Sequence, residues 1–168
     1  MENNVSLLEM LDARERRAQR QQQLQAQYRT TLVCFTMNIA GPVKDTPLIR
    51  RGFARGRQLL ERQFLRCRWT PLYTDVSRAV TGCEAFYVLD ASPLEIKRVT
   101  TLVEDASPLG RLFDMDVLRP DGKKVDREEL HLEGRKCLIC GGPAKVCSSR
   151  RVHTVAELQA RTTAILTE

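Results

Sequence analysis

The sequence predicts an α+β fold, a ferredoxin-like split βαβ plait with an N-terminal helix and a small C-terminal lobe that contains cysteine and histidine. From residue 31 the apolar pattern predicts the order strand, helix, strand, strand, helix, strand. With 168 residues, 42% of them hydrophobic, the chain can form one conventional core. We expect a single domain, residues 1–168, that comprises a helix (1–30), an α/β catalytic core (31–130) and the cysteine-containing lobe with a final helix (131–168).

The N-terminal helix is predicted by a capping box, Ser6 followed by Glu9, before a polar stretch rich in Arg, Gln and Ala that extends to about Tyr28. The run 31–40 is apolar and β-branched almost throughout, which is typical of a central strand covered on both faces. A basic amphipathic helix is expected over about 48–65, because apolar residues recur there at helical spacing between arginines.

Two strands joined by a turn are expected at 69–76 and 84–91, because a polar-glycine link separates two apolar runs. A serine-proline pair at 92–93 then predicts the start of a helix that extends to about Asp105. The inward side of this helix is expected to comprise Leu94, Val99, Leu102 and Val103.

The C-terminal third is expected to begin with a strand over 111–118, which turns into a short return strand near 124–130. A compact cysteine segment follows. Thr154 and Glu157 form another capping box, which predicts a final helix that extends to about Leu166.

The net charge of +6 is unevenly distributed along the chain. Residues 44–68 carry a surplus of +6 and residues 135–151 a surplus of +5, so the remaining residues sum to −5. Two such basic segments suit an anionic partner, whether phosphates, nucleic acid or an acidic protein, although each can also be a solvated face.

Asp114 and Asp116 stand two residues apart in a predicted strand, so their side chains should point to the same face. Two carboxylates this close repel each other unless a cation neutralises them. Mg²⁺ is bound through one or two protein carboxylates and substrate phosphates in phosphoryl-transfer and nucleotidyl-transfer sites. The pair therefore predicts a Mg²⁺ site, with an exposed Asp-x-Asp on an edge strand as the alternative.

Three of the six cysteines form a set with a histidine. Cys137, Cys140, Cys147 and His153 have the spacing C-x2-C-x6-C-x5-H, and these residue types suit structural zinc. The alternatives are reduced thiols that pack a small lobe, or a phosphate site formed by Arg150 and Arg151. A catalytic Cys–His pair is less favoured, because nothing marks an oxyanion hole or an orienting acid.

The segment 41–45, Gly-Pro-Val-Lys-Asp, lies between the predicted central strand and the following helix. Backbone amides and a lysine at such a position can bind an anionic group. The glycines and the terminal Lys-Ser/Thr of a Walker loop are missing, so the segment alone is a weak indication of phosphate binding.

Together these residues resemble the citrate lyase holo-acyl-carrier-protein synthase family, also called apo-citrate lyase phosphoribosyl-dephospho-CoA transferase. The resemblance covers about residues 7–158. Three blocks carry it, namely 32–36 with 41–45, then 107–118, and finally 135–140 with Ala144, Cys147 and His153.

The resemblance implies a nucleotidyltransferase-type enzyme. It would transfer the phosphoribosyl-dephospho-CoA group from its triphosphate precursor, triphosphoribosyl-dephospho-CoA, to a serine of the acyl carrier (gamma) subunit of citrate lyase, and release pyrophosphate. Asp114, Asp116 and Arg111 would be catalytic, with the two aspartates on Mg²⁺. The residues expected to bind substrate are Lys44, Arg50, Arg51, Arg127, Arg150 and Arg151. The general base stays open among Glu84, Asp90 and Asp126.

Two other classes of protein fit parts of the sequence. A zinc-stabilised nucleic-acid-binding module would use the same basic segments on phosphate backbone, but aromatic residues make up only 5% of the chain and single-strand binders stack bases on aromatic rings. A non-catalytic assembly factor for the lyase would keep the partner without the chemistry. No apolar run long enough to span a membrane and no export signal is seen, so we expect a cytoplasmic protein.

Overall fold

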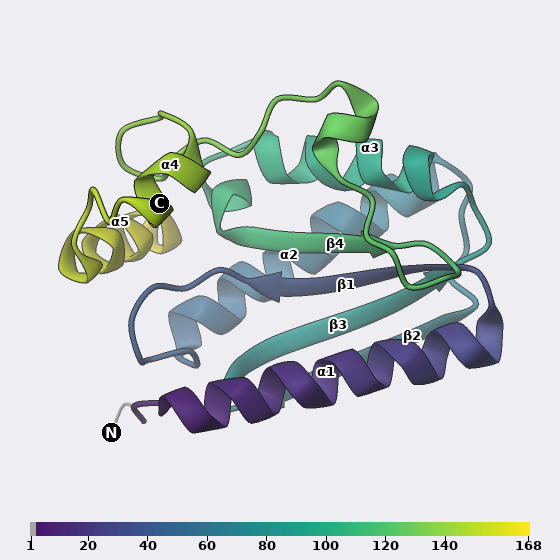
Figure 1. The fold of residues 1–168 in the computed structure, drawn as a ribbon, viewed down its shortest axis with the longest axis horizontal. Coiled ribbons are helices and arrows are strands. Elements are labelled where there is room, and N and C mark those ends of the chain that lie inside the picture. The colour runs from purple at the N-terminus through teal and green to yellow at the C-terminus, as the bar shows by residue number, and fades with distance from the viewer. Residues whose placement is uncertain (1–2) are drawn as a thin grey trace.

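The computed structural model describes residues 3–168 and shows a three-layer α+β arrangement in which α1 covers one face of a four-stranded sheet, while α2 and α3 cover the other (Figure 1). Residues 1–2 of the predicted N-terminal segment lie outside the described part. The strands are β1 (Thr31–Met37), β2 (Tyr73–Ala79), β3 (Gly82–Leu89) and β4 (Phe113–Leu118). The helices are α1 (Leu7–Tyr28), α2 (Pro47–Arg66), α3 (Pro93–Asp105), α4 (Ala144–Ser149) and α5 (Val155–Thr167).

The sheet is antiparallel throughout, with the strand order β2-β3-β1-β4. From β1 onward the elements follow the predicted order of strand, helix, strand, strand, helix, strand. Strands β1 and β3 are therefore central, and β4 forms one edge. Short 3₁₀ turns at Leu109–Leu112 and Arg127–Leu130 flank β4 along the chain.

Helix starts follow the capping residues of the sequence. The Ser6 hydroxyl accepts a hydrogen bond from the Glu9 backbone at 3.2 Å, while the Glu9 carboxylate accepts from the Ser6 backbone at 2.8 Å. Thr154 and Glu157 repeat this reciprocal pair at the start of α5. These side chains satisfy donors that the helix leaves unpaired, so both predicted capping boxes are confirmed.

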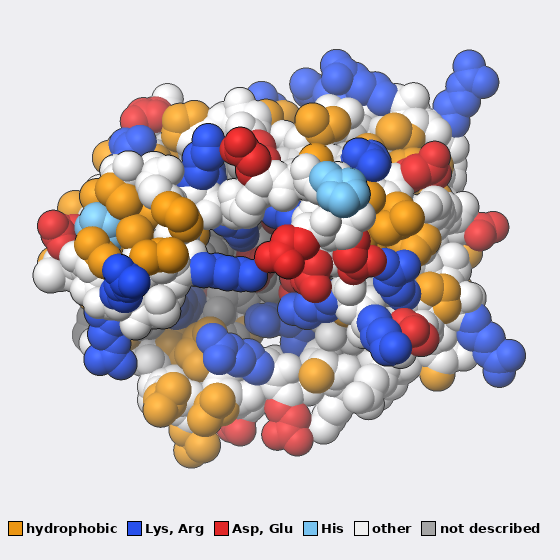
Figure 2. Space-filling model, turned by 45° about the horizontal axis from the view of Figure 1, so that its top comes forward, with side chains coloured by type: hydrophobic (Ala, Val, Ile, Leu, Met, Phe, Trp, Pro, Cys, Tyr) orange, Lys and Arg blue, Asp and Glu red, His pale blue; other side chains and the backbone are white. Residues whose placement is uncertain are grey.

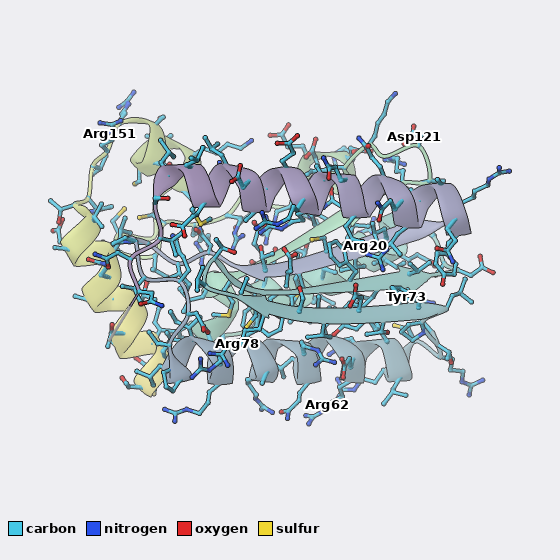
Figure 3. All side chains as sticks on the ribbon, turned by 90° about the horizontal axis from the view of Figure 1, so that it is seen from below. Arg20, Arg62, Tyr73, Arg78, Asp121 and Arg151 are labelled. Atoms are coloured by element: carbon cyan, nitrogen blue, oxygen red, sulfur yellow. The ribbon has the colours of Figure 1, made fainter. Side chains whose placement is uncertain are left out.

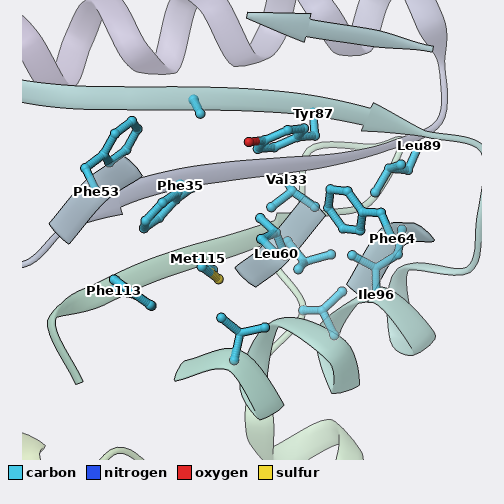
Figure 4. Close-up of a cluster of buried hydrophobic side chains, with 14 residues drawn as sticks. Val33, Phe35, Phe53, Leu60, Phe64, Tyr87, Leu89, Ile96, Phe113 and Met115 are labelled. Atoms are coloured by element: carbon cyan, nitrogen blue, oxygen red, sulfur yellow. The ribbon is translucent and has the colours of Figure 1, made fainter. Parts of the chain in front are cut away.

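Strand β1 is buried on both faces, as its apolar sequence predicts. On one face Val33 and Phe35 pack against α2 and α3, and Phe35 stacks on Phe53 with ring centroids 4.7 Å apart (Figure 4). On the other face Leu32 and Cys34 pack against Leu24 of α1. The sheet is thus fixed between two apolar layers, and this holds its register.

Helix α3 turns its predicted face inward only in part. Val103 is buried as expected, whereas Leu102 is 65% exposed and Ile96, Thr100 and Glu104 are buried. One Glu104 oxygen accepts a hydrogen bond from the Met115 backbone at 2.9 Å. Because a buried carboxylate is stable when it is paired and hydrogen-bonded, this acid can lie on the inward side of the helix.

The predicted return strand at 124–130 is reduced to a single bridge between Leu118 and Lys124. A 3₁₀ turn follows, in which Asp126 and Glu129 form a capping box. This local hydrogen bonding competes with strand pairing, which explains why the ladder ends. None of the helices within residues 3–168 has the length and apolarity needed to cross a membrane.

Candidate active site

Asp114 and Asp116 lie on one face of β4, the face toward α1, while Phe113, Met115 and Val117 are buried on the other face. Their neighbours on β1 are Thr36 and Cys34, respectively. The side chain of Asp114 is 47% exposed and that of Asp116 is 31% exposed. Solvent and ligands can therefore approach both carboxylates.

The two carboxylates share their surroundings with two cations. Lys124 Nζ lies 2.7 Å from Asp116 Oδ2, and Arg135 Nη1 lies 3.7 Å from Asp114 Oδ1. Burial raises the pKa of Asp114, and the negative charge of Asp116 raises it further, whereas Arg135 acts in the opposite direction. A divalent cation between the two oxygens would remove this repulsion, and aspartate oxygens are ligands that Mg²⁺ prefers.

Arg135 joins the C-terminal lobe to the start of β4. One of its nitrogens donates to the backbone oxygens of Arg111 at 2.9 Å and Phe113 at 2.6 Å. Neither Arg135 nor Lys124 was among the residues predicted for the site. Arg135 lies in the basic segment 135–151, two residues before Cys137, and this position could have suggested a role in the site. Nothing in the sequence around Lys124 suggests such a role.

Lys44 is the predicted phosphate-binding residue that the structure places close to the aspartates. It lines a cavity of about 180 Å³ between α1 and the end of β1, and Asp114 lines the same cavity. Arg14 and Arg17 of α1 also line it, although neither was predicted. Burial lowers the pKa of Lys44, and the charge of Arg14 lowers it further.

Arg50 and Arg51 are not brought to this cavity. Arg50 forms an ion pair with Asp45 at 3.1 Å and lines a separate hollow with Arg78. Arg51 is exposed on α2. Their predicted role in substrate binding stays a prediction.

Arg127 makes internal ion pairs. It lies 2.5 Å from Glu104 and 3.0 Å from Asp105, both on α3, and its side chain is only 10% exposed. These contacts tie the turn after β4 to α3. They leave little of the guanidinium for a substrate, so a structural role explains this residue better than the predicted binding role.

A larger hollow separates the sheet from the C-terminal lobe, and Figure 2 shows Lys and Arg side chains beside it. Its volume is about 590 Å³, within the range of small-molecule sites. The lining combines cationic and apolar side chains, including Arg111, Arg135, Arg151, Leu112, Leu138 and Leu158. Arg150 is exposed at the end of α4.

The four predicted zinc ligands converge at one point in the lobe. The ligand atoms of Cys137, Cys140, Cys147 and His153 all lie within 4.8 Å of one another, and the sulfurs of Cys140 and Cys147 are 3.5 Å apart. Tetrahedral zinc with Zn–S bonds of about 2.3 Å sets its sulfurs roughly 3.8 Å apart. Within the described chain, the buried Nε2 atom of His153 has no hydrogen-bond partner. This donor set fits zinc.

The backbone of the lobe favours thiolate at one of these cysteines. A hydrogen bond from the Gly142 backbone, aided by His153, lowers the pKa of Cys140 to about 6. Gly141 directly follows Cys140 and has a φ of +72°, a conformation that favours glycine. Its backbone N–H donates to the Cys137 oxygen at 3.1 Å and so closes the turn that carries the first two ligands. The sequence Cys-Gly-Gly-Pro thus builds the tight knuckle that its spacing indicates.

Two adjacent carboxylates on a sheet face, with cations around them, are typical of metal-dependent enzymes that transfer phosphoryl or nucleotidyl groups. A family model described as apo-citrate lyase phosphoribosyl-dephospho-CoA transferase matches residues 5–168. The chain therefore belongs to this family of transferases.

Relatives agree with this assignment. An apo-citrate lyase phosphoribosyl-dephospho-CoA transferase of Citrobacter koseri is 34% identical over 96% of this chain and 88% of its own length. The enzyme of the same name from Shigella boydii is 32% identical over 98% of this chain and 90% of its own length. Protein CitXG of Haemophilus influenzae is 35% identical over 93% of this chain, which spans only 34% of that longer protein.

The ion pairs of Arg127 with α3 predict that this residue contributes to the stability of the fold. Arg127→Gln leaves the buried Glu104 without its counter-charge, so the free energy of unfolding should fall by about 3 kcal/mol. Arg150→Gln, at an exposed position, should change it by less than about 0.5 kcal/mol. Urea denaturation followed by circular dichroism measures both. Unchanged stability of Arg127→Gln together with weaker substrate binding would instead support the predicted binding role.

Proposed function

We propose that this protein transfers the phosphoribosyl-dephospho-CoA group from triphosphoribosyl-dephospho-CoA to a serine of the acyl carrier subunit of citrate lyase. The family match over residues 5–168 carries this proposal. The paired Asp114 and Asp116 on β4 support it, because transfer from a triphosphate needs a divalent cation beside the reacting phosphorus.

The chemistry is an in-line displacement at the innermost phosphorus of the triphosphate. The carrier serine oxygen forms a bond to this phosphorus, the bond from the phosphorus to the next bridging oxygen breaks, and pyrophosphate leaves with the electron pair. The serine proton passes to a base. Mg²⁺ held by Asp114 and Asp116 would stabilise the charge on the phosphate oxygens. Lys44 and Arg111, which line the two cavities beside the carboxylates, would add positive charge.

Of the three acids considered as base, one lies on the reacting face. Glu84 of β3 and Asp114 of β4 are both register partners of Thr36 on β1, so the two acids share a row across the sheet. Glu84 forms an ion pair with Arg17 at 2.7 Å. Asp126 caps a 3₁₀ turn, and Asp90 is exposed beyond the end of β3. Because Glu84 lies in the same row as Asp114, it is the first candidate to test as the general base.

We also propose that the fold is a ferredoxin-like plait. The element order and the antiparallel sheet order, with the first and third strands central, support this assignment. The basic segments 44–68 and 135–151 support an acidic carrier subunit as partner, because complementary charge speeds encounter. None of the six cysteines, all within the described residues, forms a disulfide, and this supports the cytoplasmic location that the sequence suggests.

A nucleic-acid-binding function is not favoured. Phe35 stacks on Phe53, and Phe64 meets Tyr87 edge-on, both within the core. The half-buried Tyr28 and Tyr73 pack against each other between α1 and β2 rather than forming an open stacking surface. Stacking on exposed rings is the main sequence-tolerant contact with single strands. The basic segments alone do not supply it.

The direct test combines the protein with apo carrier subunit, triphosphoribosyl-dephospho-CoA and Mg²⁺. Mass spectrometry should show the carrier gaining the mass of the phosphoribosyl-dephospho-CoA group, with release of an equal amount of pyrophosphate. A carrier whose serine is changed to alanine is the control and should gain no mass. An unmodified wild-type carrier, with correctly folded enzyme, would contradict the proposal.

The same assay tests the carboxylate pair. Asp114→Asn and Asp116→Asn should each lower the transfer rate by roughly a thousandfold, because the loss of a metal ligand removes several kcal/mol of transition-state stabilisation. Circular dichroism should remain unchanged. Asp121→Asn, in an exposed turn, is the matched control and should transfer at the wild-type rate. Near-normal turnover of either Asp114→Asn or Asp116→Asn would rule out the proposed metal site.

We propose that Cys137, Cys140, Cys147 and His153 hold a structural zinc ion. Elemental analysis of protein purified without chelator should find about one zinc per chain, because four ligands complete one tetrahedral site. Cys140→Ser should lose the metal and lower the melting temperature, while Cys67→Ser, outside the cluster, should retain it. Metal-free wild-type protein with an unchanged melting temperature would show that the cluster is only a packing feature.

A further inference from the structure

The small cavity beside Asp114 differs from the larger hollow at the C-terminal lobe in size and in charge. Its volume of about 180 Å³ lies below the roughly 300 to 1,000 Å³ of sites that hold drug-sized molecules. Arg14, Arg17 and Lys44 line it, and Asp114 is the acid in its wall. A cavity this small and this cationic suits a compact anion rather than a nucleoside.

Helix α1 presents an arginine stripe to the sheet, because Arg14, Arg17 and Arg20 recur at intervals of three residues. Arg17 pairs with Glu84 at 2.7 Å. Arg20 donates to Tyr73 Oη at 2.6 Å and lies 3.4 Å from Asp75, and Figure 3 shows Arg20 and Tyr73 where α1 meets the sheet. The second and third arginines of the stripe are therefore neutralised by strand residues.

Arg14 and Lys44 are the cations of the cavity that lack a counter-charge. Within residues 3–168 neither forms an ion pair, and Lys44 Nζ donates only to the backbone oxygen of Ile39. Asp45, the acid next to Lys44 in the chain, is already paired with Arg50 and Arg78. Lys44 is half buried and Arg14 is exposed, and both line the one cavity. Two positive groups so placed repel each other, and a bound anion would relieve that cost.

From this geometry we propose that Arg14 and Lys44 form a binding site for inorganic pyrophosphate, and hence for the two outer phosphates of a triphosphate substrate. The assignment to substrate rests on the proposed function. It identifies α1 as part of the active site, where the sequence indicated only a polar helix. Because Asp114 lines the same cavity, a metal ion on this carboxylate would contact the bound phosphates.

The site would act at the step in which the bond to the leaving group breaks. As the phosphorus–oxygen bond to the middle phosphate cleaves, one further negative charge develops on the departing pyrophosphate. Arg14 and Lys44 would stabilise this charge more strongly than the intact triphosphate, which lowers the barrier. The carrier serine would attack from the opposite side of the phosphorus.

Calorimetric titration of the full-length protein with inorganic pyrophosphate in the presence of Mg²⁺ tests this proposal. Arg14→Gln and Lys44→Gln should each weaken binding by roughly tenfold to a hundredfold, as expected for the loss of one charge-assisted hydrogen bond. Arg16→Gln is the matched control, because Arg16 is exposed on the same helix and does not line the cavity. It should bind pyrophosphate with wild-type affinity.

The outcome separates this proposal from the transfer function. Wild-type affinity for pyrophosphate in both Arg14→Gln and Lys44→Gln, with unchanged circular dichroism, would overturn the site even if the carrier is modified normally. Equal weakening in Arg16→Gln would also overturn it, because the effect would then reflect net charge alone. Selective weakening in the two cavity variants supports the site even if the carrier gains no mass, and in that case only the transfer function fails.

Discussion

The pairing of β4 with β1 is the constraint on which the candidate active site depends. Phe113, Met115 and Val117 are buried against α2 and α3, so the alternation of the strand forces Asp114 and Asp116 onto the opposite face. A shift of one residue in register would bury both carboxylates in the core and expose the apolar side chains. The burial of these apolar side chains therefore fixes the position of the two carboxylates.

The C-terminal lobe contributes to the same site through Arg135. This residue lies two positions before Cys137, and its guanidinium reaches both the start of β4 and the Asp114 carboxylate. The lobe also packs closely on α2, since a side chain at Gly52 would meet Leu166 of α5. A metal ion in the cysteine cluster would fix the segment that carries Arg135. A zinc ion at this cluster would therefore serve the chemistry indirectly, by positioning Arg135.

Local patterns predicted most of the fold. Capping boxes, the two-residue alternation of β4 and the apolar run of β1 are each determined by neighbours in the sequence, and they agree with the structure. The inward face of α3 was predicted only in part: Val103 is buried as expected, but Leu102 is exposed. The buried Glu104 on that helix is stabilised by Arg127, 23 residues further along the chain. Local spacing carries no information about such a partner.

The same distinction applies to the site. The aspartate pair and the C-x2-C spacing are visible in the sequence. Only the fold brings Lys124 and Arg135 to the carboxylates, and Arg14 to the cavity that Asp114 lines. Arg50 and Arg127 are equally basic but form ion pairs elsewhere, and Arg51 is exposed on α2. Composition predicts that a cationic site exists, and only the fold determines which cations form it.

The central claim is that Asp114 and Asp116 hold a divalent cation facing the cavity between α1 and the sheet. A crystal structure of the protein with Mn²⁺ and pyrophosphate tests it most directly, because manganese gives an anomalous signal and replaces Mg²⁺ at oxygen ligands. We predict an anomalous peak bound to both carboxylates, with pyrophosphate between it and Arg14 and Lys44. Ordered carboxylates without a peak, or pyrophosphate bound elsewhere on the molecule, would contradict the account.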